Sequence, residues 1–420
     1  MPTLLSLPTE ILGLICNEVA RPRDNPGWGR FFGTVPKSLA ALSRTCRLLH
    51  RIVEPTLYHS VSISSNFYPL FRTLVSRNDL ASHVRALFIE EWEHYGHSIE
   101  SLLEQQEAVE KLALKLSHDA DRNLRLLESD WLTREHFEDP ASDDECDEYD
   151  DHPTGKFFFA LMLLLIPKVE YLNFRIYYHL EKGLYFPNSF PHLTEICFGD
   201  SATEGGTSLV KIDSLLVAAP NLRVLKGHMV SNTSNVSRHD GIRELHLEYS
   251  ALDVESLMSI MNSFPFLEVF IYESGGAIAT DGDEATPREF GEALLQRKDT
   301  LRKIDIDLSY SFNIDDLTHL NDMQSLASME VLESLSIHSS MISPRTRHGA
   351  TTDGTLLTGL LPRSIKSFAF CISDNHAYIY QDAWQLARVA NERFPNLKNV
   401  DIIGADVEEN KRLKKAFVSN

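Results

Sequence analysis

The sequence predicts an α/β fold, a solenoid of short parallel strands and helices that follows a small helical module at the N-terminus. Three observations support this prediction. After residue 80 one pattern recurs, in which apolar residues occupy the first, fourth and sixth positions of a six-residue stretch. Prolines precede many of its copies, and apolar residues at helical spacing occupy the segments between them.

The repeated pattern predicts the strands. Its copies begin at Val84, Val169, Leu193, Leu222, Ile242, Leu267, Leu301, Leu332, Ile365 and Leu397. From Val169 onward, successive copies are separated by as few as 20 residues, from Leu222 to Ile242, and by as many as 34, from Leu267 to Leu301. The prolines that stand two residues before a copy, and so end the preceding helix, are Pro167, Pro191, Pro220, Pro265 and Pro395.

The segments between the copies predict helices. One carries the apolar stripe Leu209, Ile212, Leu215, Leu216 and Ala219. Another opens with Thr286, Pro287 and Glu289, which provide a helix cap, a first-turn proline and a capping-box glutamate. Because no unit can bury its apolar face alone, stacking of the units makes the core. The pattern resembles an irregular leucine-rich repeat of the helix-bearing type, which implies parallel strands on a concave face and helices on a convex face.

The apolar segment at residues 4–19 has three possible interpretations: a secretory signal, a membrane anchor, or a helix that docks on another protein. No Lys or Arg precedes the segment, and Pro8 and Glu10 interrupt it, so it fits neither a signal nor a membrane span. Ser6 can cap a helix that has Pro8 in its first turn. The apolar stripe of that helix is Ile11, Leu12, Ile15 and Val19.

A second helical pattern follows a loop at residues 21–37 that is rich in proline and glycine. Its apolar positions are Leu39, Leu42, Cys46, Leu49, Ile52 and Val53. Its basic side chains are Arg44, Arg47, His50 and Arg51. A module of this size has a marginal core, and its apolar positions are too many for one short helical hairpin to cover. We therefore expect either the rest of the chain or a partner protein to complete one face.

Residues 4–61 closely resemble an F-box, the motif that docks on the Skp-family adaptor of cullin–RING ubiquitin ligases. The opening of the motif is matched by Leu7, Pro8, Glu10 and Ile11, and its later series by Leu39, Leu42, Ser43, Cys46 and Arg47. The ending EPTLYHSV resembles fungal-type members, whereas the loop at 21–37 is longer than usual. The resemblance implies that the adaptor contacts are Leu7, Pro8, Ile11, Leu12, Ile15, Leu39, Leu42 and Cys46. The alternative is that these residues pack an internal helical cap.

The domain organisation predicted on this basis is an F-box-like helical module over residues 1–61 and a repeat region over residues 62–420. The formal net charge is −20, and nine acidic residues fall within Glu138–Asp151. We expect a disordered insertion around residues 138–155, which is either a solvated loop or a segment that attracts a basic partner electrostatically. The acidic balance and the lack of a basic stripe argue against a nucleic-acid partner.

The sequence offers little chemistry. Five scattered cysteines, none in C-x-x-C spacing, indicate neither a disulfide framework nor a zinc site, and they favour the cytoplasm or the nucleus. There is no phosphate-binding loop, dinucleotide fingerprint, zinc-protease motif or nucleophile elbow. His94, His97 and the stretch Asp281–Glu284 lack further metal ligands at suitable spacing. We expect no metal, no cofactor, no membrane partner and no enzymatic activity.

The variable positions inside the strands should point to the concave face, where a solenoid binds its partner. The candidate target-binding residues are Tyr171, Arg175, Lys226, His228, Glu244, His246, Lys303 and Asp305, and Glu248, Glu273 and Asp307 share the face. Together with the F-box resemblance, this face predicts a substrate receptor of an SCF-type ubiquitin ligase. Its module would bind the Skp-family adaptor and, through it, a cullin, and its repeats would bind an unknown target protein. The alternatives are a scaffold or binding protein outside any ligase and, third, an enzyme with a site in residues 93–156.

Overall fold

The computed structural model describes twelve parts of the chain: residues 6–20, 37–63, 68–89, 159, 161–175, 190–199, 206–275, 284–309, 322–342, 354–372, 380–404 and 407–419. Several features considered in the sequence lie outside these residues. They are the acidic insertion around 138–155, the loop at 21–37 apart from Lys37, and the pair His94 and His97.

The N-terminal segment forms three short helices: α1 (Thr9–Ala20), α2 (Lys37–Ser43) and α3 (Arg47–Leu57). Their shared core contains Cys16, Leu39 and Val53, all buried, with Val19, Leu42, Ile52 and Leu57 packed around them. The first helix begins at Thr9, later than a cap at Ser6 would place it. The carbonyl oxygen of Pro8 accepts hydrogen bonds from the N–H groups of Ile11 and Leu12 instead. A residue before proline disfavours helical backbone, so Leu7 cannot start the helix.

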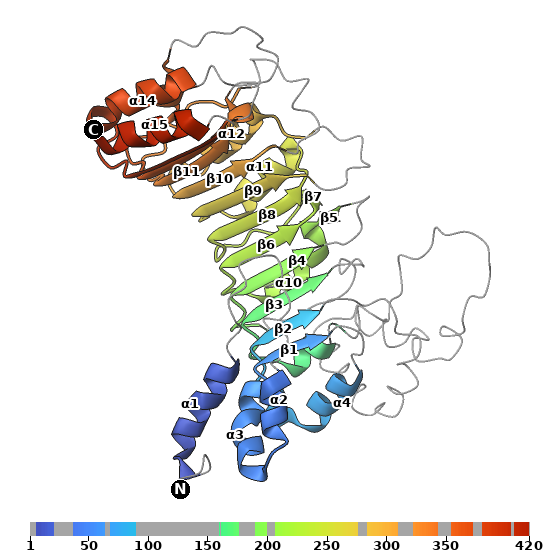
Figure 1. Ribbon diagram of the computed structural model, residues 1–420. Coiled ribbons are helices and arrows are strands. Elements are labelled where there is room, and N and C mark those ends of the chain that lie inside the picture. The colour runs from blue at the N-terminus through green and yellow to red at the C-terminus, as the bar shows by residue number, and fades with distance from the viewer. Residues whose placement is uncertain are drawn as a thin grey trace, which may run out of the picture. The chain divides into compact units, whose positions relative to one another are not determined.

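Eleven strands form one sheet in the order β1-β2-β3-β4-β6-β8-β9-β10-β11-β12-β13 (Figure 1). Their bounds are β1 Ser60–Ile63, β2 Ala86–Ile89, β3 Tyr171–Arg175, β4 Glu195–Gly199, β6 Val224–His228, β8 Glu244–Ser250, β9 Val269–Ser274, β10 Lys303–Asp307, β11 Ser334–His338, β12 Ser367–Ile372 and β13 Asn399–Gly404. The neighbouring pairs β1–β2, β2–β3, β6–β8 and every pair from β8 to β13 are parallel. The predicted α/β class with a parallel sheet is therefore confirmed.

Each copy of the apolar pattern is followed by a strand that begins two residues after the copy's first apolar residue. The strand β1 was not predicted. The apolar pattern is nevertheless present, because Tyr58, Val61 and Ile63 have the same spacing as the other copies. Tyr58 also caps the C-terminus of α3, so in the sequence this copy overlaps the helical pattern before it. The predicted module boundary at residue 61 falls inside this strand.

The remaining helices connect the strands. They are α4 Tyr68–Ser76, α5 Asn78–Ala81, α10 Asp213–Ala218, α11 Val254–Ser263, α12 Pro287–Leu295, α13 Leu356–Leu360, α14 Tyr380–Arg393 and α15 Val407–Ser419, with the 3₁₀ turns η4 Leu209–Ile212 and η7 Ser339–Met341. The strands β5 (Thr207–Ser208) and β7 (Val230–Asn232) form a separate small sheet. The capping box predicted at α12 is confirmed, since Thr286 and Glu289 bond reciprocally and Pro287 occupies the first turn.

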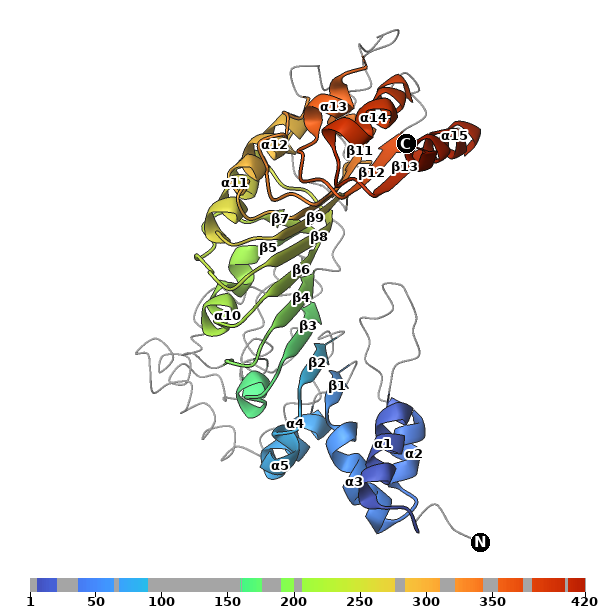
Figure 2. The same cartoon turned by 90° about the vertical axis from the view of Figure 1, so that its left-hand side faces the viewer.

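The chain divides into two compact units, residues 1–198 with 214–222, and residues 199–213 with 223–420. In the second unit, α11, α12 and α13 lie on one face of the strands (Figure 2). Every second strand residue is buried on that face, for example Leu245 in β8, Phe270 in β9 and Ile304 in β10. The residues between them, on the opposite face, are partly exposed. No described helix covers that opposite face over β6, β8, β9 and β10, and we call it the open face.

Candidate protein-binding surfaces

The first surface is an apolar stripe on α1. Leu7, Ile11 and Leu14 are 39%, 42% and 61% exposed. Ile11 and Leu14, three residues apart, lie on one side of α1, and Leu7 stands just before the helix. Leu48, at the start of α3, is exposed as well. Large apolar side chains gathered in this way indicate a surface that another protein covers.

The structure separates the predicted adaptor contacts into two groups. Leu7, Pro8 and Ile11 are exposed, and Ile15, Leu42 and Cys46 are partly exposed. Leu12 and Leu39 are buried, so in this conformation they support the helices from inside and present no side-chain surface.

Cys46 also has a local role, because its sulfur accepts a hydrogen bond from the Leu49 N–H at 3.5 Å as the cap of α3. Leu14 and Leu48 were not among the predicted contacts. Leu14 could have been found, since it stands three residues after Ile11 on the same stripe.

Basic side chains accompany this stripe. Arg44, Arg47, His50 and Arg51 are all exposed, within the turn before α3 and along the helix. The chain as a whole carries a net charge of −20, so this concentration of positive charge is a local exception. Basic and apolar side chains exposed on the same small module favour a partner with both acidic and apolar groups.

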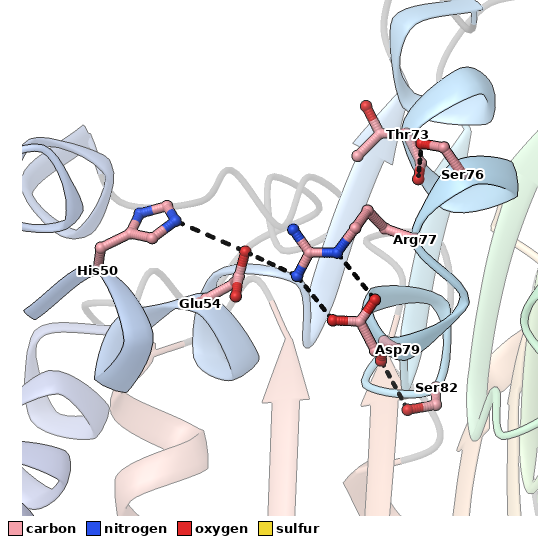
Figure 3. A network of polar contacts seen from close by, with 7 residues as sticks. All are labelled: His50, Glu54, Thr73, Ser76, Arg77, Asp79 and Ser82. Carbon is pink, nitrogen blue, oxygen red and sulfur yellow. Dashed lines mark hydrogen bonds and ion pairs between the residues drawn. The ribbon is translucent and has the colours of Figure 1, made fainter. Parts of the chain in front are cut away.

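A polar network holds α3 against the segment that follows β1 (Figure 3). The Arg77 guanidinium lies 3.3 Å from the Glu54 carboxylate of α3 and donates to both Asp79 carboxylate oxygens, at 2.9 and 2.6 Å. His50 lies 3.6 Å from the same Glu54 oxygen. The hydrogen bonds from Arg77 lower the pKa of Asp79. Arg77, Asp79 and His50 are about half exposed, although Glu54 is mostly buried, so the network contributes orientation more than stability.

The second surface is the open face of the second unit. Strand register places its residues in rows that cross the strands. One row contains Lys226, His246, Ile271 and Asp305, and a neighbouring row contains Glu244, Val269 and Lys303. The structure thus brings together Lys226, Glu244, His246, Lys303 and Asp305, which were predicted to bind the target. Burial and the nearby Lys226 lower the pKa of His246, whose ring lies 3.5 Å from the Glu244 carboxylate.

Tyr171 and Arg175 lie on β3, in the first unit, where both are partly exposed. The Tyr171 hydroxyl donates to the Cys197 sulfur at 3.3 Å and accepts from the Asn173 amide at 3.4 Å. Burial raises the pKa of Tyr171. These contacts hold the Tyr171 ring against β3 and β4.

A third row crosses the carboxyl ends of the strands. It contains Glu248, Glu273 and Asp307, which we call the carboxylate row, and it begins with His228 beside Glu248. Burial and the charge of Glu273 raise the pKa of Glu248 to about 7. Burial and the charge of Asp307 raise the pKa of Glu273. Each of the three acids stands six residues after the first apolar residue of its repeat, a sequence signal that predicts their adjacency.

Glu248→Gln should increase the free energy of unfolding at high pH and leave it nearly unchanged at low pH. The folded-state pKa of Glu248 lies above its ordinary value of 4.5, so the folded chain holds this proton longer than the unfolded chain. Stability is therefore lost as pH rises from about 4.5 to about 7, and the variant removes that loss. We expect a gain of about 1–2 kcal/mol above pH ~7.5, allowing for solvent screening of a half-buried group.

Urea denaturation at several pH values measures this effect. The exposed Glu255→Gln, with the same change of charge, is the control and should follow the wild-type profile. An equal gain in both variants would assign the effect to net charge and not to the carboxylate row.

Comparisons with known proteins return no family model and no curated protein that matches this chain. Among the described residues, no three His, Cys, Asp or Glu side chains gather into a metal-binding group. None of the helices in the described parts combines the length and the apolar composition needed to cross a membrane.

Proposed function

We propose that this protein is the substrate receptor of an SCF-type ubiquitin ligase. In this role α1, α2 and α3 act as an F-box that docks on a Skp-family adaptor and, through it, on a cullin. The strands and helices that follow act as an irregular leucine-rich-repeat solenoid that binds a target protein. The observation that carries the proposal is the exposed stripe Leu7, Ile11 and Leu14 on a helical module that has a buried core of its own.

Two further features support the docking assignment. The sequence match to the F-box is ordered over both parts of the module, and its opening Leu7–Pro8 stands just before α1, where the Pro8 carbonyl accepts the first backbone hydrogen bonds of the helix. The basic side chains on α3 suit an acidic adaptor surface. The four cysteines of the described residues are free thiols, in keeping with a ligase of the cytoplasm or nucleus.

The protein's contribution to the ligase is positioning. A target held on the repeats reaches a high effective concentration at the ubiquitin-loaded enzyme, and no bond is made or broken by this chain. A solenoid suits this task because its rows of partly exposed side chains form a broad surface.

Leu7→Asp combined with Ile11→Asp should abolish adaptor binding. Both side chains are exposed, so two carboxylates there leave the core of the module intact and place charge within the apolar contact. Loss of two interface anchors weakens binding by about a hundredfold or more. Co-purification of the full chain with a purified Skp-family adaptor, followed by calorimetric titration, measures the change.

The matched control is Val254→Asp, an exposed apolar residue on α11 in the second unit, which should bind like wild type. Thermal unfolding should be the same for all three chains. A wild-type chain that does not bind the adaptor would refute the ligase assignment and leave a scaffold or binding protein outside any ligase. A double variant that binds as well as wild type would refute the role of the stripe.

A further inference from the structure

The carboxylate row is a compact group of like charges. Asp307 is the register partner of Glu273, and Glu248 lies on the next strand, close enough for its charge to act on Glu273. Neighbouring strands are separated by ~4.8 Å, so the three carboxylates lie within ~10 Å of one another. Like charges on adjacent strands destabilise a sheet. The folded chain alone has no evident reason to place them together.

At the other end of the same strands, opposite charges are paired. At the amino ends of β8 to β12 the residues alternate in sign, and ion pairs join them across the strands. Arg243 lies 3.5 Å from Glu268, and Glu333 accepts both Arg302, at 3.2 Å, and Lys366, at 2.9 Å. One end of the sheet is therefore neutralised internally.

The carboxylate row lacks such pairing. No ion pair joins Glu248, Glu273 or Asp307 to a basic side chain of the described residues. One Glu248 oxygen, Oε2, is buried and accepts no hydrogen bond. Among the described residues, the Asp307 carboxylate accepts a hydrogen bond from the Ser309 N–H, at 2.8 Å. The charge of Lys226 acts on Glu248 from the same face without forming an ion pair, and the remaining negative charge of the row is left for a cation from elsewhere.

An aromatic pair borders the row and indicates which cation it suits. The register between β8 and β9 shifts after Leu247, and Tyr249 there adopts a left-handed backbone with φ of 49°. Its ring is exposed and lies 5.4 Å from the His228 ring. A guanidinium spreads its charge over a plane, tolerates partial burial, pairs with carboxylates through two bonds and stacks on aromatic rings. An ammonium group is more strongly hydrated and lacks the planar fork.

We propose that the open face at Glu248, Glu273 and Asp307 binds an arginine-rich segment of another protein, with Tyr249 and His228 beside the bound guanidinium groups. The inference rests on the proposed function only in calling that protein the ligase target. The contacts of the face are independent of α1, α2 and α3, so the site can be measured without the adaptor.

Titration of the full chain with a fluorescent hexapeptide of alternating glycine and arginine tests this proposal. We expect saturable binding, weakened about tenfold or more by Glu248→Gln with Glu273→Gln and Asp307→Asn, since each exposed ion pair contributes up to about 1 kcal/mol. The matched lysine peptide should bind more weakly, and the citrulline peptide should not bind. The control chain carries Glu255→Gln, Asp299→Asn and Glu330→Gln, the same loss of charge at exposed sites, and should bind like wild type.

The acidic stretch Glu138–Asp151 could attract the same peptide, so the titration is repeated in a full chain whose nine acids there are replaced by their amides. Binding that survives these replacements and disappears with the carboxylate-row variant supports the proposal. Binding lost with the stretch, or equal loss in the control chain, overturns it. Loss of adaptor binding with peptide binding intact would refute the ligase assignment alone.

Discussion

Leu39→Asp is expected to unfold the three N-terminal helices and to leave the second unit folded. Leu39 is 1% exposed and packs with Cys16 and Val53 at the centre of the module. An unpaired carboxylate there costs several kcal/mol, and a core this small supplies only a few. Hydrogen–deuterium exchange resolved by peptide measures the result, with rapid exchange expected in α1, α2 and α3 and little change in β8 to β12.

The control is Leu14→Asp, which places the same charge on the same module at a residue 61% exposed. Its exchange pattern should match wild type. The pair also separates two causes of lost adaptor binding, because Leu39→Asp removes the folded module and Leu14→Asp changes only its surface. Slow exchange of the helices in Leu39→Asp would show that the module's stability does not depend on this core.

Phe270→Ala is expected to lower the free energy of unfolding by about 3–5 kcal/mol. Phe270 is fully buried in β9, between its register partners Leu245 of β8 and Ile304 of β10, and its ring stacks on Tyr272 at 6.3 Å. Truncation leaves a cavity that the paired strands on either side cannot close. Urea denaturation followed by tyrosine fluorescence and circular dichroism measures the loss.

Phe266→Ala provides the comparison within one repeat. Phe266 is 44% exposed and carries the Arg243 guanidinium 5.0 Å above its ring. Its loss should cost about 1 kcal/mol or less, the value of an exposed cation–π contact with some apolar area. Equal losses in the two variants would mean that the buried stack is not what stabilises the second unit.

The strands were predictable because two periodicities act on the same residues. Ile242, Leu245 and Leu247 alternate as a half-buried strand requires, and their repetition in Leu267, Phe270 and Tyr272 indicates that the strands stack. Proline two residues before five of the ten copies adds an independent stop for the preceding helix. The alternation within each copy, the repetition of the copies and the prolines before five of them agree, so the sequence predicts the parallel sheet.

The exposed apolar stripe was less predictable. Ile11 and Leu12 are adjacent and equally apolar, yet Ile11 is exposed and Leu12 is buried. Which of them faces the core depends on where α2 and α3 lie, and those helices are separated from α1 by residues 21–36. Spacing along one helix gives the width of its apolar stripe and not the direction of its neighbours.

The carboxylate row required pairing as well as pattern. Glu248, Glu273 and Asp307 were placed on the correct face from alternation alone. Their adjacency depends on strands that pair in parallel across connections of unequal length, in the register that sets Leu247 opposite Tyr272 and Glu273 opposite Asp307. A register displaced by one residue would have sent all three to the buried face.

Because buried and partly exposed residues alternate within each strand, neighbouring residues are under different evolutionary constraints. Phe270 and Tyr272 cannot change without loss of stability, whereas Ile271 and Glu273, their immediate neighbours, lie partly exposed on the open face. Substitutions at the second set leave the scaffold untouched, and insertions between strands leave the rows in place. A lineage carrying this architecture can therefore alter its open face one side chain at a time, without passing through an unfolded ancestor.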